Sequence, residues 1–186
     1  TTGCELLDYS FEELLSSQDL PEFDYIGLHG IWSWVSQHNR EVITEIIRQK
    51  LRVGGVVYVS YNTTPGWAGF GPVRHLITEH ASVLSSSGKG LANKIDDAIE
   101  FTERLLALDP KYNLSYPGAL EKLTSFKDQS RDYLAHEFFN KDWHPMHFSE
   151  VARLLSGAKL DFAAPAELLQ HVDSFHLTEG QRDFLE

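Results

Sequence analysis

The chain contains very little cysteine, because Cys4 is its single cysteine among 186 residues. One cysteine cannot form a disulfide within the chain, so we expect a reducing compartment, the cytoplasm. Long apolar runs are lacking as well. No stretch approaches the roughly 20 apolar residues that a membrane-spanning helix needs, and no signal-peptide pattern is present. These absences predict a protein without a membrane partner.

Positive charge is also scarce. The sequence has 16 Lys and Arg against 27 Asp and Glu, which gives a formal net charge of −11. Nucleic-acid binding needs clustered basic residues that neutralise phosphates. Arg48, Lys50 and Arg52 are close in sequence, but they stand at the end of a predicted helix, where cations suit the helix dipole. We therefore expect no nucleic-acid partner and interpret the acidity as a solubility feature. A basic partner or substrate is the alternative.

A glycine-rich turn between a strand and a helix, which usually holds the nucleotide part of a cofactor, is absent too. The sequence also begins Thr-Thr-Gly, without methionine. We expect it to be a fragment of a longer protein that supplies the missing turn.

The clearest pattern in the chain is a strand, a helix and a second strand. Residues 23–29 and 56–61 are predicted strands, and residues 36–51 between them carry apolar side chains at helical spacing. Gly54-Gly55 is predicted to stop the helix. The second strand is almost continuously apolar, which predicts burial on both faces. Strands joined in this way should be parallel, so their carboxyl ends should meet at one edge, where open sheets bind ligands.

The rest of the chain is predicted to be mainly helical. Residues 85–90 (SSSGKG) are the best candidate for a linker between two domains, residues 1–87 and 88–186. Residues 62–72 are predicted to be a loop, and short strands are predicted at 4–8 and 159–162. A helix capped by Ser10 is predicted near 9–15, because Glu13 stands at the capping-box position. Further helices are predicted at 73–84, 91–106, 118–127, 129–139, 149–156 and 166–171.

Two polar, aromatic loops follow the predicted strands. The first is His29-Gly30-Ile31-Trp32-Ser33-Trp34, and the second runs from Tyr61 and Asn62 to Trp67. The indoles can be core anchors whose N–H groups are bonded, or they can form a wall for a flat or cationic ligand. Asn and Thr side chains can likewise satisfy the backbone of a turn. Two such loops at adjacent strand ends favour a pocket.

Metal binding and nucleophilic catalysis find little support. His136, His144 and His147 have acidic neighbours, but their spacing matches no known metal site, so we predict no metal. Cys4 is near the terminus, and no nucleophile elbow occurs.

Three strings, taken in order, resemble one family. They are HGIWSWVS, GGVVYVSYNTTPGW and YLAHEFFNKDWHPMHFSEVARLL. They are similar to bacterial class I S-adenosylmethionine-dependent methyltransferases that carry a methyltransferase regulatory domain, some of which methylate protein lysines. The resemblance implies an α/β fold, in which a partial Rossmann-like parallel sheet, the second half of the methyltransferase core, precedes a mainly helical regulatory-type domain.

The resemblance also implies site residues. A polar residue after the third strand of such enzymes contacts the adenine, and Asp8, Tyr9 or Ser10 fills that place here. His29 and Gly30 would border the methionine part of the cofactor. His29 is the candidate catalytic residue, because imidazole can orient the nucleophile or accept its proton. The implied substrate-binding residues are Trp32, Ser33, Trp34, Tyr61, Asn62 and Trp67.

The missing glycine-rich turn sets the limits of this hypothesis. We expect S-adenosylmethionine to bind the full-length parent, and to bind this chain weakly or not at all. We therefore expect a methyltransferase fragment that is inactive alone, with a protein as the possible substrate. The alternative is a non-catalytic regulatory or interaction module. In the family the strand at 23–29 pairs with the missing first strand, so its exposed edge predicts a homo-oligomer.

Overall fold

The computed structural model describes residues 3–84 and 88–185. The chain divides into two compact units. The first takes in the described residues up to His29, then Gln37–Val59, then the described residues from Ser149 onward. The second consists of Gly30–Ser36 and Ser60–Phe148. The expected domains, 1–87 and 88–186, stay a prediction, and positions 85–87 of the expected linker lie outside the described residues.

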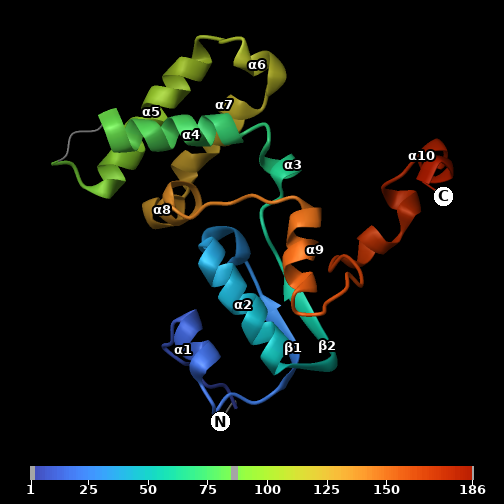
Figure 1. Ribbon diagram of the computed structural model, residues 1–186. Helices are drawn as coiled ribbons and strands as arrows, with labels where there is room; N and C mark the ends of the chain where they lie inside the picture. The colour runs from blue at the N-terminus through green and yellow to red at the C-terminus, as the bar shows by residue number, and fades with distance from the viewer. Residues whose placement is uncertain (1–2, 85–87, 186) are drawn as a thin grey trace. The chain divides into compact units, whose positions relative to one another are not determined.

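The first unit contains the predicted strand–helix–strand arrangement (Figure 1). Strand β1 (Phe23–Leu28) pairs in parallel with β2 (Leu51–Val59), and helix α2 (Gln37–Lys50) connects them in sequence. The parallel pairing is confirmed. Val42, Ile43, Ile46 and Ile47 of α2 are buried, as their spacing predicted. Burial of each such side chain contributes about 1.5–3 kcal/mol to folding.

The predicted role of Gly54-Gly55 as the stop of α2 was wrong, although the helix ends within one residue of its predicted end. The helix ends at Lys50, and β2 begins directly at Leu51, so Gly54 and Gly55 lie inside the strand. Pairing shifts from Phe23 opposite Leu51 to Tyr25 opposite Val56, which leaves an irregular stretch on β2. Gly54 has φ +83°, in the left-handed region that favours glycine. The glycines therefore serve a bulge in the strand and not a helix cap.

The prediction that the second strand is buried on both faces was also wrong. No residue of β2 is fully buried, and Tyr25 and Val56, opposite each other, are 59% and 58% exposed. The physical reason is that the described residues form a sheet of two strands only, so little covers it. The homo-oligomer that was predicted from the exposed strand edge stays a prediction.

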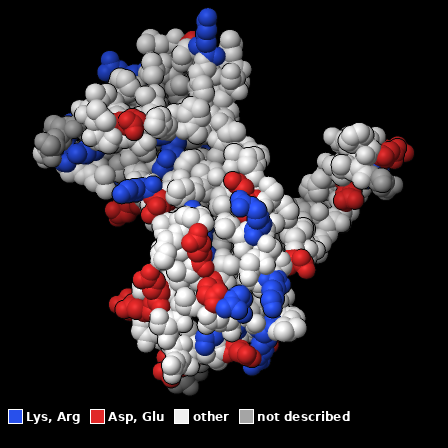
Figure 2. Space-filling model, viewed as in Figure 1, with Lys and Arg blue, Asp and Glu red and all other residues white. Residues whose placement is uncertain are grey.

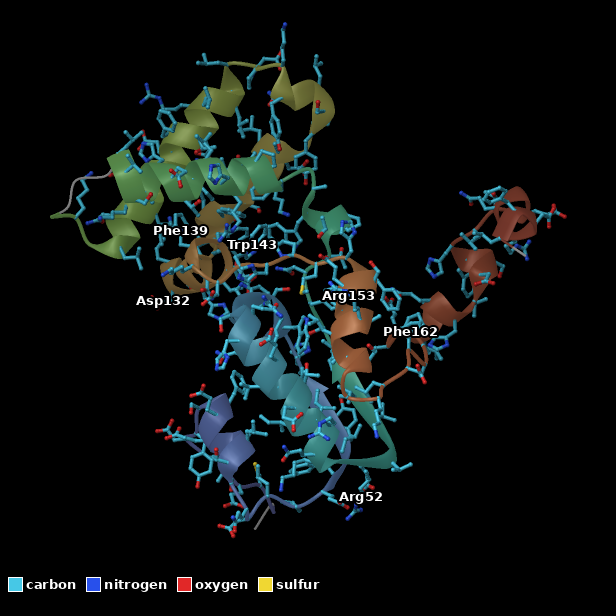
Figure 3. The ribbon with its side chains drawn as sticks, viewed as in Figure 1. Arg52, Asp132, Phe139, Trp143, Arg153 and Phe162 are labelled. Carbon is cyan, nitrogen blue, oxygen red and sulfur yellow. The ribbon has the colours of Figure 1, made fainter. Side chains whose placement is uncertain are left out.

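Helix α1 (Phe11–Ser16) confirms the predicted cap. The backbone N–H of Ser10 donates to the Glu13 carboxylate at 2.7 Å, and the Glu13 N–H donates to the Ser10 hydroxyl at 3.2 Å. The short strands predicted at residues 4–8 and 159–162 do not form, because neither segment pairs with a neighbouring strand. Ion pairs of Arg52 with Asp24 and Glu22 lie on the exposed surface of this unit (Figure 3).

Helices build the second unit, and their bounds follow the sequence pattern closely. The predicted loop 62–72 contains one short helix, α3 (Thr64–Trp67). The Thr63 hydroxyl caps this helix by accepting a hydrogen bond from the Gly66 N–H. The remaining elements are α4 (Gly71–Glu79), a π-helical turn (His80–Leu84), α5 (Leu91–Ala107), α6 (Tyr112–Ser115), α7 (Ala119–Thr124), a 3₁₀ turn (Ser125–Asp128) and α8 (Arg131–Phe139).

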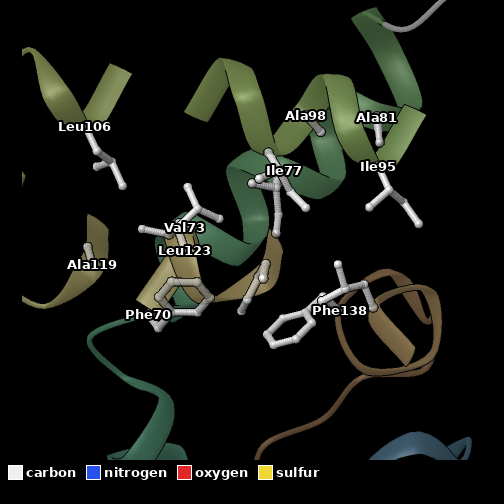
Figure 4. Packing of buried hydrophobic residues seen from close by; sticks show 13 residues of the cluster. Phe70, Val73, Ile77, Ala81, Ile95, Ala98, Leu106, Ala119, Leu123 and Phe138 are labelled. Carbon is white, nitrogen blue, oxygen red and sulfur yellow. The ribbon is translucent and has the colours of Figure 1, made fainter. Parts of the chain in front are cut away.

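The core of the second unit is apolar and aromatic (Figure 4). Phe70, Ile77 and Leu123 lie in its centre and are at most 1% exposed. The rings of Phe126 and Phe138 are 4.1 Å apart between centroids, and Phe70 meets both edge to face. Such pairs add about 0.5–1.5 kcal/mol each beyond area burial. Trp67, which is partly buried, packs against this core.

The last described segment returns to the first unit. Helix α9 (Phe148–Ser156) buries Val151, and the residues beyond it form short turns and a final helix. These elements are two 3₁₀ turns, Leu168–His171 and Asp173–Phe175, and α10 (Glu179–Leu185). Large apolar side chains after α9 are exposed, among them Phe162 at 62%, before the first of these turns, and Phe184 of α10 at 87%. Phe162 is labelled in Figure 3.

Candidate functional site

His29 directly follows β1, in the first unit. Its ring stacks on Tyr58 of β2, with centroids 6.0 Å apart and planes 15° from parallel. The His29 Nδ1 lies 3.4 Å from the Tyr58 hydroxyl. The imidazole is exposed, so its other face remains accessible to a ligand. The strand end thus presents an imidazole oriented by Tyr58, and the catalytic role of His29 stays a prediction.

Asp8, Tyr9 and Ser10 also belong to the first unit, and all three are exposed. The Ser10 hydroxyl is engaged in the capping box of α1, where it also lies 2.8 Å from the Glu13 carboxylate. The Asp8 carboxylate has no such local bond among the described residues, and Tyr9 is 52% exposed. Of the three candidates for the adenine contact, Asp8 and Tyr9 are therefore the more available.

Gly30 and Ser33 join the two loops in the second unit. The Gly30 N–H donates to the Ser60 hydroxyl at 2.7 Å, and Gly30 has φ +69°, in the region that favours glycine. The Asn62 N–H donates to the Ser33 hydroxyl at 2.7 Å. The loop after β1 and the loop after β2 are therefore held together by two hydrogen bonds. The pocket that was predicted between these two loops stays a prediction.

Ser33 also contacts a third loop that sequence reasoning missed. The His144 N–H donates to the Ser33 carbonyl at 2.9 Å. Ser33 and Trp32 are 0% exposed, inside the short 3₁₀ turn Trp32–Trp34. Ser33 is thus a buried connector, and its assignment and that of Trp32 to substrate binding stay predictions.

Two buried donors near these loops have no hydrogen-bond partner among the described residues. They are Trp34 Nε1 and Asn62 Nδ2. Trp34 is partly buried, and its ring lies 5.7 Å from His136. A buried donor without a partner costs about 1–3 kcal/mol, so such groups call for a ligand or an ordered water. Asn62 thereby offers an amide that could hold a polar group of a cofactor or substrate.

Tyr61 and Trp67 complete the predicted set. Burial raises the pKa of the Tyr61 phenol above its ordinary value. Trp67 ends α3, and its indole meets Trp143 edge to face, with centroids 5.3 Å apart. Trp143 lies on the segment between α8 and α9 (Figure 3) and was missed by sequence reasoning. The string DWHPMH, which we quoted only for its resemblance, was the available signal.

The histidines considered for metal binding remain scattered. His136 and Glu137 approach to 3.7 Å, and so do His144 and Asp142. Within residues 3–84 and 88–185, no group of three or more His, Cys, Asp or Glu side chains is placed to hold a metal ion. The same described ranges contain no helix with the length and apolar character needed to cross a membrane. On the face drawn in Figure 2, acidic and basic side chains are interspersed.

Comparison with known proteins finds one family and several relatives that are similar to this chain. Residues 130–186 match the family described as "Predicted methyltransferase regulatory domain". An uncharacterized protein of Synechocystis is 43% identical over 180 residues, which are 97% of this chain and 35% of that protein. An uncharacterized protein of Rickettsia prowazekii is 35% identical over 96 residues, 46% of this chain and 38% of the relative. The chain spans little more than a third of the length of these relatives.

Solved structures show the fold. PKMT2 from Rickettsia typhi is similar with a TM-score of 0.61 at 21% identity, over 92% of this chain and 33% of PKMT2. PKMT2 in complex with AdoHcy gives 0.59 at 21% identity, over 90% and 34%. The match to the regulatory-domain family falls inside the region 88–186 for which such a domain was predicted. The chain has the fold of part of PKMT2, and its residues 130–186 are similar to the methyltransferase regulatory domain family.

Proposed function

We propose that this chain forms part of an S-adenosylmethionine-dependent methyltransferase whose acceptor is the side-chain amine of a protein lysine. Strands β1 and β2 would be the fourth and fifth strands of a class I core. The observation that carries this proposal is the junction of the loops after both strands, through Gly30–Ser60 and Ser33–Asn62. The fold shared with PKMT2, of which one structure holds AdoHcy, supports it.

Methyl transfer requires few chemical tasks of the protein itself. S-adenosylmethionine, when bound, supplies the methyl group. The acceptor amine must be neutral, in line and shielded from water, so positioning and proton removal are the protein's tasks. The exposed His29 imidazole, which stacks on Tyr58, would accept the proton that the incoming ammonium releases.

The residues that would hold the cofactor can be tested for fit. Asn62 Nδ2 is a buried donor that lacks a partner among the described residues, which suits a carboxylate or ribose oxygen. The left-handed Gly30 allows close backbone approach at the strand end. Asp8 and Tyr9 are exposed and available for the adenine, whereas the Ser10 hydroxyl caps α1. Within the second unit, Gly30 and Asn62 therefore fit a polar part of the cofactor.

The test is calorimetric titration with S-adenosylmethionine. The first sample is this chain, which we expect to bind weakly or not at all, because the glycine-rich turn is not in its sequence. The second is a chimera in which this chain replaces the matching 180 residues of the Synechocystis relative. We expect the chimera to bind. Tight binding by the chain alone would contradict our account of the missing turn, and a folded chimera that fails to bind would favour a non-catalytic interaction module.

Transfer itself is measured in the chimera with radiolabelled cofactor and a lysine-rich protein acceptor. His29→Ala should lower kcat about tenfold or more while leaving cofactor affinity unchanged. The control is His75→Ala, because His75 is an exposed histidine of α4 whose side chain the proposal does not use. If His29→Ala and His75→Ala transfer the methyl group at equal rates, His29 has no role in catalysis.

A further inference from the structure

A pocket of about 220 Å³ opens beside the Trp67–Trp143 pair, entirely within the second unit. We call it the tryptophan pocket. Its lining is mostly apolar and comes from α3, the start of α4 and the segment before α9: Thr64, Trp67, Ala68, Gly71, Trp143 and Pro145. A volume of this size accommodates one large side chain and is too small for an entire cofactor.

Backbone hydrogen bonds fix the two walls of the tryptophan pocket. The Thr64 N–H donates to the Met146 carbonyl, and the Met146 N–H donates to the Asn62 carbonyl, both at 3.0 Å. Met146 is buried, and Thr63 forms an isolated parallel bridge with it. The pocket is therefore shaped before a guest arrives, which lowers the entropic cost of binding.

Two cations lie on the indoles of this pocket. The Lys122 ammonium is 4.3 Å from the Trp67 ring centroid and 4.5 Å from that of Phe70. The Arg74 guanidinium is 4.0 Å from the centroid of Trp143. Cation–π contacts of this kind contribute about 0.5–2 kcal/mol each. They place positive charge at both indole walls.

Neither cation forms an ion pair with a described residue. Arg74 donates from Nη2 to the Asn140 carbonyl at 3.0 Å, and its Nε has no partner among the described residues. Desolvation lowers the pKa of Arg74 to about 10 and lowers that of Lys122. Elsewhere in the unit, Arg131 and Lys127 are paired with carboxylates at 2.6 and 2.8 Å. In a chain of net charge −11, these two partly desolvated cations lack a carboxylate partner within the described residues.

The charges also decide which guest the pocket disfavours. A cation on one face of an indole draws electron density from the ring and repels a second cation. A lysine ammonium is therefore a poor guest, although an aromatic pocket alone would attract one. An apolar side chain suits the lining, and adjacent carboxylates suit Lys122 and Arg74.

We infer that the tryptophan pocket recognises an apolar residue flanked by acidic residues in the protein substrate, away from the lysine that accepts the methyl group. This inference rests on the proposed function, because it names the chemistry of the same substrate. It assigns Trp143, Arg74 and Lys122 to substrate recognition. The acceptor lysine would occupy a different place, and the pocket would select which proteins are bound.

The experiment uses fluorescein-labelled peptides and fluorescence anisotropy, without cofactor. The first peptide has a central leucine between glutamates, the second has glutamines in their place, the third has alanine for leucine, and the fourth has lysine for leucine. We expect the first to bind most tightly, and each replacement to weaken binding about tenfold. Binding of the first should also weaken as salt increases. Tightest binding of the lysine peptide, or equal binding of all four, would overturn the inference.

Variants connect binding with the named residues. Lys122→Gln should weaken binding of the first peptide about threefold to tenfold, and Lys122→Arg should retain it. Lys111→Gln is the matched control, since Lys111 is an exposed lysine of the same unit and the change removes the same charge. Ala68→Leu should block the pocket from an exposed wall position without removing a core side chain. If Lys122→Gln and Ala68→Leu both bind like Lys111→Gln, the pocket is not the binding site.

Failure here is distinguishable from failure of the proposed function. If this chain binds the peptide and the chimera does not bind S-adenosylmethionine, the peptide-binding role of the pocket is supported and the methyltransferase proposal is refuted. If the chimera binds the cofactor and methylates protein, but Ala68→Leu leaves KM for the protein acceptor unchanged, the methyltransferase proposal is supported and the role of the pocket is refuted.

Discussion

Gly69 is the position where the structure predicts a sharp cost for one added methyl group. A Cβ there would lie 2.5 Å from Cδ2 and 2.8 Å from Cε2 of Tyr116. The Tyr116 ring cannot simply swing away, because it packs on Phe70 with centroids 6.4 Å apart, and the Tyr112 hydroxyl donates to the Gly69 carbonyl. Gly69→Ala therefore overpacks the border of the core. We expect it to lower the free energy of unfolding by about 1–3 kcal/mol.

The matched control for this change is Gly118→Ala. Gly118 is in the same unit, has φ −77°, and has no atom within 4 Å of the place that an added methyl group would take. Its substitution should change stability by less than about 0.5 kcal/mol. In the double variant with Tyr116→Leu, Gly69→Ala should cost much less than in the native background, because the clashing ring is gone.

Urea unfolding followed by tryptophan fluorescence suits this measurement. All four tryptophans lie in the second unit, so their emission reports on the region that contains Gly69. The midpoint should fall while the slope stays constant. If Gly69→Ala and Gly118→Ala unfold at the same urea concentration, the packing of Tyr116 against Gly69 is not as described.

Two further predictions concern a side chain at the site and the surface of the sheet. Burial raises the pKa of Tyr61, so the folded state holds that proton more tightly than the unfolded state, and the associated stability is lost as pH rises from about 10 through the folded-state pKa. Above pH 10, wild type should therefore lose stability faster than Tyr61→Phe in urea titrations, and parallel curves would contradict the burial of this phenol. We also propose that the exposed edge of β1 associates with a second copy, so Tyr25→Lys, at a β1 residue that is 59% exposed, should reduce the mass seen by light scattering at micromolar concentration. Val83→Lys, at a valine 69% exposed in the other unit, should not, and a monomeric wild type would refute the proposal.

Local pattern predicted the elements better than it predicted their contacts. Strand β1, helix α2 and the parallel partner follow from side-chain periodicity, and the Ser10 cap follows from spacing. Gly54 and Gly55 misled the prediction, because glycine ends helices and permits bulges equally well, and tertiary pairing made the choice. The burial of β2 was overestimated. An apolar strand sequence shows that the strand can be buried, but it does not show whether other elements pack on both of its faces.

The sequence pointed to the candidate residues, but it did not predict which loops distant in sequence contact one another. The loops after both strands were recognisable from their polar and aromatic residues. The contact of Ser33 with His144, and that of Trp67 with Trp143, join segments far apart in the chain, which no local spacing encodes. Lys122 is likewise an ordinary helix residue in sequence, and only the packing of α7 places its ammonium on an indole.

The bridge between Thr63 and Met146 has a consequence for the order of folding. The two residues are about eighty positions apart, and α3 to α8 lie between them in sequence. Closing so long a loop is entropically unfavourable until the intervening helices have collapsed onto their own interior. We therefore expect the peptide groups around Met146 to gain protection from hydrogen exchange late, after those of α5 and α8, so that nascent chains acquire a stable helical bundle well before they acquire a competent binding surface.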